Sequence, residues 1–126
     1  YGPTEATVWS TVHKMKAENN YSAVPIGQPI PYASNFILDK FERPVPIGII
    51  GELFIGGQGI SSGYFNRPDL TKNRFIQNPF EKDSKLYKTG DLAKWTANGQ
   101  IEFLGRADQQ VKIRGHRIEL DEIRSQ

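Results

Sequence analysis

The sequence has no cysteine and no long apolar run, and each absence excludes a class of protein. Without cysteine, the chain has neither disulfide bonds nor thiolate metal sites. No stretch approaches the ~20 consecutive apolar residues that a membrane helix needs, and no basic segment followed by an apolar run indicates export. We therefore expect a cytoplasmic protein that has no membrane partner.

Histidine and excess charge are also scarce. His13 and His116 are the only histidines, and their separation supports neither a histidine-rich metal site nor a Ser-His-Asp triad. The formal net charge of +2 is too small to indicate nucleic-acid binding. The basic segment from Gly105 to Arg117 has no interleaved aromatic residues for stacking on bases, so a solvent-facing strand is the simpler interpretation.

The residues that are present have the composition of a turn-rich globular domain. The chain has 126 residues, of which 37% are hydrophobic and 24% charged, which suits one domain with one core. Twelve glycines and eight prolines separate short apolar runs. This pattern predicts a chain of many strands joined by turns.

Local patterns predict several of these elements. Residues 32–38 predict a strand with one mostly buried face, from which Ile37 points away. Residues 47–50 and 52–55 predict an extended pair interrupted by glycine. A hairpin is expected over 92–105, because Asn-Gly at 98–99 supplies the positive φ angles of a tight turn.

One short helix is expected at residues 67–76. Pro68 suits the first helical position because its missing N–H is not needed there, and Asp69 suits the first turn. Leu70 and Phe75 supply the apolar contacts of this helix.

Three sequence motifs could carry chemistry, and each has a simpler alternative. GELFIGGQGISSG, at 51–63, is glycine-rich like a phosphate-binding loop. No Lys-Ser or Lys-Thr follows it, so turns and bulges between strands explain it better. Asp91 in KTGDL could accept both hydroxyls of a ribose diol or serve as a turn residue. Val8 and Trp9 would either pack in a core or line an apolar ligand pocket.

The order of the motifs adds information that no single motif carries. YGPTE, GELFIGGQGISSGYFNRPDLT, YKTGDL and GRADQQVKIRGHRIELDEI together resemble four successive motifs of the adenylate-forming enzymes. The resemblance runs from Tyr1 to Arg124. RPDLTKNRFIQNPF and KIRGHRIEL are similar to the amino-acid-activating adenylation domains of nonribosomal peptide synthetases. The resemblance therefore implies an internal segment of such a domain.

The family's reaction has two halves. A carboxylate attacks the α-phosphate of ATP to give an acyl-adenylate and pyrophosphate, and a carrier-protein thiol then takes the acyl group. The resemblance implies ATP and Mg²⁺ for the parent enzyme, since the negative charge on the phosphates must be neutralised. It also implies an amino acid substrate, the rest of the adenylation domain, and a peptidyl carrier protein that bears phosphopantetheine.

The resemblance assigns a nucleotide-binding role to four residues. Tyr1 matches the aromatic residue that packs beside adenine, as a flat ring suits a purine face. Asp91 matches the acceptor of the ribose diol. Phe103 matches an aromatic residue near the nucleotide, and Arg106 matches an arginine that reaches the ribose and phosphates.

Four residues near the start match the catalytic and substrate positions of the family. Thr4 matches a hydroxyl near the α-phosphate, and Glu5 matches the carboxylate that holds Mg²⁺, a hard ion that prefers oxygen ligands. Val8 and Trp9 match two positions of the pocket that selects the amino acid, with Trp9 limiting its depth or forming a flat wall.

The end of the chain resembles the hinge region of the family. Asp108 matches the hinge, where a few residues absorb a large change in φ and ψ. Lys112 and Gly115 match the strand and loop that swing toward the site for thiol transfer. We expect residues 1–107 to be the end of the large lobe and residues 108–126 to be the hinge and the start of the small lobe.

The expected fold is mainly β (α+β). It comprises a distorted small β-barrel, the first strands of the C-terminal lobe and one or two short helices. The family's upstream phosphate loop and late lysine are absent, so the isolated chain is predicted to be inactive. Two alternatives stay open: a segment of an acyl-CoA-synthetase-like ligase, and a non-catalytic β module that binds a nucleotide. Exposed apolar surface also predicts self-association.

Overall fold

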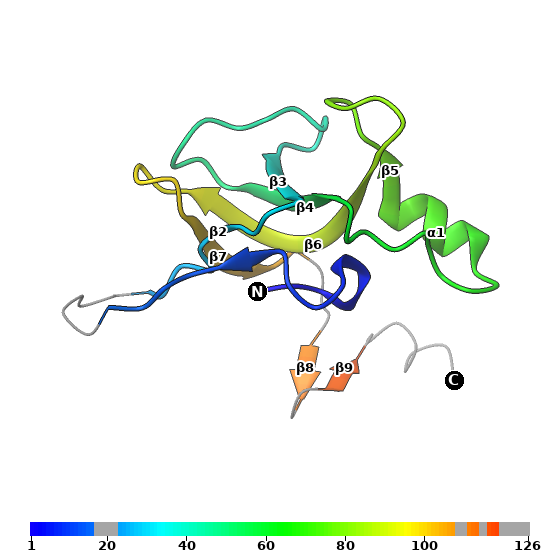
Figure 1. Cartoon of the computed structure of the whole chain (residues 1–126), viewed down its shortest axis with the longest axis horizontal. Coiled ribbons are helices and arrows are strands. Elements are labelled where there is room, and N and C mark those ends of the chain that lie inside the picture. The colour runs from blue at the N-terminus through cyan, green and yellow to red at the C-terminus, as the bar shows by residue number, and fades with distance from the viewer. Residues whose placement is uncertain (17–22, 108–110, 114–115, 119–126) are drawn as a thin grey trace.

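Antiparallel strands dominate the computed structural model, which describes residues 1–16, 23–107, 111–113 and 116–118 (Figure 1). The elements in chain order are η1 (Thr4–Ala6), β1 (Thr11–Val12), β2 (Gln28–Pro29), β3 (Ala33–Leu38), β4 (Gly51–Gly57), α1 (Pro68–Arg74), β5 (Phe75–Gln77), β6 (Lys85–Trp95), β7 (Ile101–Arg106), β8 (Val111–Ile113) and β9 (His116–Ile118). Within these ranges, no helix has the length and apolar character that crossing a bilayer requires. The prediction of a mainly β chain with one or two short helices is confirmed.

One five-stranded antiparallel sheet organises the molecule. Its strands lie in the order β3-β4-β6-β5, and β7 also pairs with β6. Residues 85–87 of β6 pair with β5, and residues 91–95 pair with β7. Both strands therefore flank the same edge of β6, and β4 flanks the other edge. The sheet curls along β6 into a half-open barrel (Figure 1). Two short pairs, β1–β2 and β8–β9, lie outside this sheet.

Apolar residues fill both faces of the sheet. One cluster consists of Ala6, Ile37, Leu53, Ile55, Ala93 and Ile101, and a second consists of Leu38, Phe54 and Leu86. The prediction that β3 buries mainly one face is wrong, because Ile37 and Leu38 belong to different clusters and are 2% and 0% exposed. Adjacent strand residues point to opposite faces, so a strand that is buried on both faces shows no simple alternation in its sequence.

Residues 47–50 do not form the predicted extended run. Strand β4 begins only at Gly51, and Ile47, Ile49 and Ile50 are each more than half exposed. The N–H of Ile49 donates to the carbonyl of Pro46 at 3.1 Å, which closes a turn. Proline and glycine in this segment favour that turn over a strand.

The hairpin is confirmed, although its loop differs in detail from the expected one. The Thr96 N–H donates to the Gln100 carbonyl at 2.8 Å, and the Gly99 N–H donates to the Thr96 carbonyl at 3.0 Å. Only Gly99, with φ of 74°, has a positive φ in this loop. The connection is therefore a turn followed by a glycine in the left-handed region, a common form of longer hairpin loop.

The predicted helix is confirmed at its start and is shorter at its end. Pro68 occupies the first turn of α1, and the helix stops at Arg74. Phe75 instead begins β5 and pairs with Tyr87 of β6. The Phe75 ring lies 5.2 Å from that of Tyr87 and 5.5 Å from that of Tyr64. Burial of Phe75 in the sheet thus ends the helix earlier than its sequence indicates.

The glycine-rich stretch serves strand packing. Its first seven residues form β4, from Gly51 to Gly57. A Cβ atom at Gly57, where φ is 104°, would lie 2.1 Å from the carbonyl oxygen of Tyr32. Only glycine permits this close approach, so the simpler interpretation of the motif holds at this position.

Candidate functional site

The register between β4 and β6 shifts at one point, and Asp91 lies there. Glu52 pairs with Leu92 and Phe54 pairs with Lys88. Between these two pairs, β4 contributes one residue and β6 contributes three, residues 89–91. Such a β-bulge bends the strand and re-aims its side chains.

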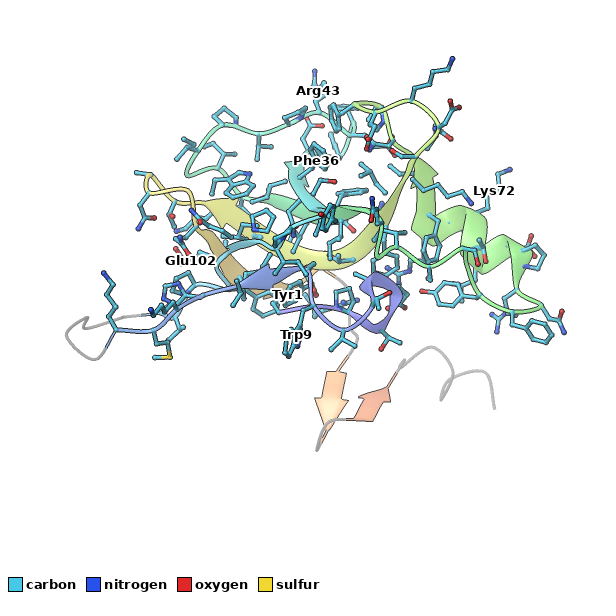
Figure 2. The ribbon with its side chains drawn as sticks, in the orientation of Figure 1. Tyr1, Trp9, Phe36, Arg43, Lys72 and Glu102 are labelled. Carbon is cyan, nitrogen blue, oxygen red and sulfur yellow. The ribbon has the colours of Figure 1, made fainter. Side chains whose placement is uncertain are left out.

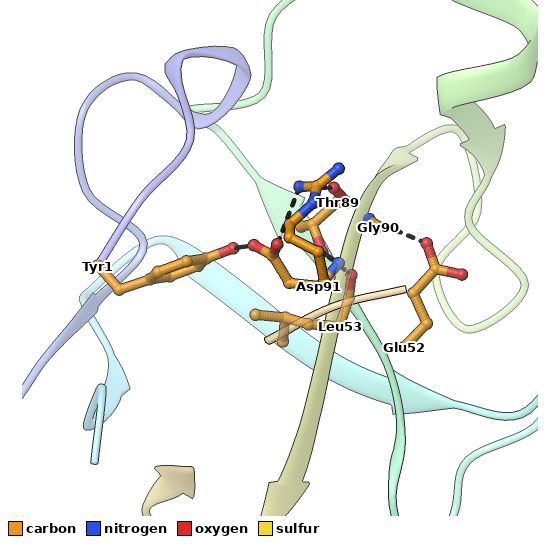
Figure 3. A network of polar contacts seen from close by, with 7 residues as sticks. Tyr1, Glu52, Leu53, Thr89, Gly90 and Asp91 are labelled. Carbon is orange, nitrogen blue, oxygen red and sulfur yellow. Dashed lines mark hydrogen bonds and ion pairs between the residues drawn. The ribbon is translucent and has the colours of Figure 1, made fainter. Parts of the chain in front are cut away.

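Side chains replace the ladder hydrogen bonds that the bulge removes (Figure 3). The Thr89 hydroxyl donates to the Leu53 carbonyl at 2.6 Å and accepts from the Asp91 N–H at 2.9 Å. The Glu52 carboxylate accepts from the Gly90 N–H at 3.0 Å. Because buried backbone groups require partners, these bonds fix the conformation of the bulge.

The Asp91 carboxylate is the centre of a buried polar network. Asp91 is 6% exposed. One of its oxygens accepts from the Tyr1 hydroxyl, and the other accepts from Arg106 Nη1 at 2.9 Å (Figure 3). Arg106 Nη1 also donates to the Thr89 carbonyl at 2.8 Å. A buried charge requires a paired and hydrogen-bonded partner, and Arg106 supplies it.

Tyr1 stays protonated in this setting. Burial raises the pKa of its phenol well above the ordinary value of 10.0, and the negative charge of Asp91 raises it further. Both effects disfavour the phenolate. Tyr1 therefore remains a hydrogen-bond donor to Asp91 at physiological pH.

A cavity of about 530 Å³ adjoins this network. It is lined by Tyr1, Gly2, Pro3, Tyr87, Thr89, Asp91, Phe103 and Arg106. The structure thus brings together all four residues that the sequence assigns to the nucleotide. The rings of Tyr1 and Phe103 lie 6.2 Å apart at 33°. Aromatic rings beside a carboxylate and a guanidinium suit a ligand with a flat ring, hydroxyl groups and negative charge.

The two residues predicted to be catalytic lie in η1, just past the Gly2-Pro3 wall of this cavity, and neither lines it. Thr4 is exposed, whereas Glu5 is 6% exposed and accepts a hydrogen bond from the Tyr64 hydroxyl at 2.6 Å. Burial, followed by the bond to Glu5, raises the pKa of Tyr64, so Tyr64 stays a donor.

The described residues contain no group of three or more acidic, histidine or cysteine side chains that could enclose a metal. Glu5 therefore fits Mg²⁺ only as a single carboxylate. That donor set is common for this ion, which usually takes one or two carboxylates together with water and substrate phosphates.

Val8 and Trp9 lie in an exposed turn, so neither belongs to the core that the described residues form. Val8 is 65% exposed and Trp9 67%, and Figure 2 shows Trp9 projecting away from the sheet. The Trp9 N–H donates to the Thr7 carbonyl at 2.9 Å, while φ is 50° at Thr7 and 72° at Val8. Such angles cost a β-branched residue roughly 1–3 kcal/mol and often occur at functional sites. Trp9 also borders a small cavity of about 150 Å³.

The three residues assigned to the hinge region are largely outside this description. Asp108 and Gly115 lie outside the described residues. Lys112 lies in β8, where its backbone is opposite Arg117 of β9. The hinge therefore stays a prediction.

Sequence reasoning missed three residues that hold the site together: Thr89, Glu52 and Tyr64. Thr89 and Glu52 lie within motifs that were recognised, but their contacts depend on the bulge between β4 and β6. Tyr64 contacts Glu5 across 59 positions of sequence, and no local pattern reveals such a contact.

Comparison with known protein sequences places this arrangement in a family. The family model described as AMP-binding enzyme matches residues 1–65. Bacitracin synthase 1 from Bacillus licheniformis is 53% identical over 128 residues, which cover 100% of this chain and 2% of that protein. Surfactin synthase subunit 3 from Bacillus subtilis (strain 168) is 54% identical over 127 residues, which cover 100% of this chain and 10% of that protein. The chain thus spans a tenth or less of these relatives.

Solved structures agree with the sequence relatives. PA1221, described as an NRPS protein containing adenylation and PCP domains, matches 99% of this chain and 26% of its own with a TM-score of 0.90 at 30% identity. NpsA-ThdA, an artificially fused adenylation-PCP di-domain NRPS from Klebsiella oxytoca, matches 97% of this chain and 23% of its own with a TM-score of 0.84 at 34% identity. These matches confirm the predicted fold class. Since the family model also covers 65 of the 126 residues, the chain belongs to the family of AMP-binding enzymes.

Proposed function

We propose that this chain is part of an amino-acid adenylation domain of a nonribosomal peptide synthetase, and that it supplies the pocket for the AMP portion of ATP. The observation that carries the proposal is the cavity that joins Tyr1, Asp91, Phe103 and Arg106. About half of the chain's residues are identical to those of bacitracin and surfactin synthases, which favours the peptide-synthetase branch over an acyl-CoA synthetase.

The pocket residues have the chemistry that a nucleotide requires. The Tyr1 and Phe103 rings offer apolar surface to adenine. Asp91 already accepts from Tyr1 and Arg106, and a carboxylate has about four acceptor positions, so about two remain for a ribose diol. Arg106, which pairs with the Asp91 carboxylate at 2.9 Å, supplies positive charge on the phosphate side.

In the adenylation step, a carboxylate oxygen of the amino acid bonds to the α-phosphorus while the bond to pyrophosphate breaks. The negative charge that accumulates needs neutralising groups. Bound Mg²⁺ would neutralise phosphate charge, and Glu5 would be one of its ligands. Thr4, exposed at the edge of the cavity wall, would donate its hydroxyl to the α-phosphate.

The other assigned residues complete the proposal. Val8 and Trp9 would contribute to the wall that selects the amino acid. Asp108 would be the hinge between a large lobe ending at 107 and a small lobe, with Lys112 and Gly115 moving toward the site. The acyl group would then pass to the phosphopantetheine thiol of a peptidyl carrier domain. Because the reaction consumes ATP and free amino acids, we place it in the cytoplasm.

Amino-acid-dependent exchange of pyrophosphate into ATP tests the proposal in the complete adenylation domain that carries these residues. Exchange is expected with at least one amino acid. Asp91→Ala should weaken AMP binding by about 100-fold, because two hydrogen bonds to a charged group are lost. Glu102→Gln is the matched control. Glu102 is a β7 carboxylate that pairs with Lys94 at 3.4 Å and lines no part of the pocket.

The outcomes separate the alternatives. Thioester formation from fatty acids would instead indicate an acyl-CoA-synthetase-like ligase. Saturable AMP binding without exchange in the complete domain would indicate a non-catalytic nucleotide-binding module. Unchanged AMP binding in Asp91→Ala would contradict the assignment of the pocket. The 126-residue chain alone is expected to show no exchange.

A further inference from the structure

We propose that Glu52 is a positioning residue for the nucleotide pocket. Its carboxylate accepts a hydrogen bond from the Gly90 N–H. By fixing the backbone of Gly90, it positions Asp91, the next residue, and Ala107, which follows β7 and bonds to the Gly90 carbonyl. The inference rests on the proposed nucleotide role of Asp91. Glu52 does not touch the pocket, so it acts only through the backbone.

Gly90 is held from both neighbouring strands. Its N–H donates to Glu52 Oε1 at 3.0 Å, from the β4 side. Its carbonyl accepts from the Ala107 N–H at 2.8 Å, directly after the end of β7. Gly90 is buried, so water does not readily replace either bond. The residue that precedes Asp91 is therefore fixed by one side chain and one backbone group.

Glu52 lies across β6 from the nucleotide pocket. Figure 3 shows Tyr1 and Asp91 on one side of the strand and Glu52 on the other. Glu52 lines a separate cavity of about 400 Å³, together with Lys88 and Ala107. A variant at Glu52 therefore removes no surface that a bound nucleotide would contact.

The two oxygens of Glu52 have different partners. Oε1 accepts from Gly90, whereas Oε2 lies 3.6 Å from Lys88 Nζ, whose side chain is 41% exposed. The bond to the Gly90 N–H is charge-assisted and partly buried, while the ion pair reaches a more exposed lysine and is more strongly screened. Substitutions can therefore separate the two roles. Glutamine keeps an acceptor for Gly90 but loses the charge, and alanine loses both.

Calorimetry with AMP and steady-state exchange kinetics test the inference in the complete domain. Glu52→Ala should raise the AMP dissociation constant and the KM for ATP about tenfold, because a buried N–H loses its acceptor and the bulge relaxes. The kcat should change less, since ribose binding is common to ground and transition states. Glu52→Gln and Lys88→Met should each stay within about twofold of the unaltered domain.

Several results would overturn the inference. One such result is an AMP affinity of Glu52→Ala equal to that of the unaltered domain. Another is a loss of AMP affinity in Lys88→Met as large as the loss in Glu52→Ala. If Glu52→Ala does not fold, Glu52→Asp takes its place: it keeps the charge but its shorter side chain cannot reach Gly90, so it should bind AMP more weakly than Glu52→Gln. Equal binding by the Asp and Gln variants would contradict the inference.

Asp91→Ala separates this inference from the proposed function. Undiminished AMP binding in Asp91→Ala means that the proposed function itself is wrong. Binding that is lost in Asp91→Ala but kept in Glu52→Ala overturns only the role of Glu52.

Discussion

Strand β6 contains a bulge at residues 89–91 and is followed by a turn at residues 96–100, and these two irregular segments are built differently. The turn closes on itself: Thr96 exchanges hydrogen bonds with Gln100 and accepts one from Gly99. The bulge depends on Glu52, Leu53 and Arg106, which are 38, 36 and 17 residues from the groups they bind. One is a local structure and the other is a product of three packed strands.

This difference decides how far a substitution in the bulge or in the turn affects the rest of the molecule. A turn made of its own residues tolerates change without consequences elsewhere, because few other groups depend on it. The bulge fixes a buried carboxylate that also binds Tyr1 and Arg106. The pocket therefore depends on the long-range structure, and substitutions should distinguish the two regions.

The largest difference is expected between two threonines. Thr89→Val should lower the free energy of unfolding by about 3 kcal/mol, because the Leu53 carbonyl and the Asp91 N–H each lose a partner in a buried site. It should also weaken AMP binding. Thr96→Val, in the exposed turn, should cost about 1 kcal/mol or less, since water replaces its bonds. Urea denaturation measures both, and equal losses would contradict the comparison.

Alkaline pH should affect the bulge network and not the turn. The pKa of Tyr1 is raised in the folded chain. The contribution of Tyr1 to the free energy of unfolding is therefore complete below about pH 10. Above that pH the tyrosine of the unfolded chain ionises first, so this contribution falls by up to about 1.4 kcal/mol per pH unit. Residues 96–100 contain no ionisable side chain. Between about pH 9 and 11, the free energy of unfolding should decline less steeply with pH in Tyr1→Phe than in the unaltered chain. The same slope in both would argue against the Tyr1–Asp91 contact.

A smaller effect is expected from the turn glycine. Gly99→Ala should cost about 1 kcal/mol, because φ of 74° disfavours a residue with a Cβ. The nearest atom to that Cβ would be Gln28 Nε2 at 3.5 Å, so no clash adds to this cost. Gly99→Asn should cost less, since asparagine tolerates this region. AMP binding should not change in either variant; a change would show that the turn is coupled to the pocket.

The smallest effect is expected from the partly exposed ion pair between β6 and β7. Glu102→Gln removes a contact of 3.4 Å with Lys94 and should change the free energy of unfolding by less than about 0.5 kcal/mol. Thermal denaturation at low and high salt measures it. A loss comparable to that of Thr89→Val would mean that the long-range bonds of the bulge have no special weight.

The elements that were predicted well are those with a local cause. Asn98-Gly99 set the hairpin loop, and Pro68 set the start of α1. Predictions failed where distant packing decides the outcome. Ile37 and Leu38 are buried on opposite faces of β3 because the sheet is covered on both sides. Residues 47–50 are different, because a local turn that Pro46 and Gly48 favour replaces the strand expected there.

The amino-acid sequence specifies the residue types of the site and their order along the chain, together with the turns whose hydrogen bonds close within a few residues. Its resemblance to adenylate-forming enzymes indicated Tyr1, Asp91, Phe103 and Arg106, but not that these residues meet. Folding brings Tyr1 and Asp91, 90 positions apart, into one hydrogen bond, and places Asp91, at the bulge, in the wall of a cavity. A bulge leaves backbone groups unpaired. Here the Asp91 N–H is bonded within β6, but the Gly90 N–H and the Thr89 carbonyl are bonded by side chains of β4 and β7, which no local pattern can specify.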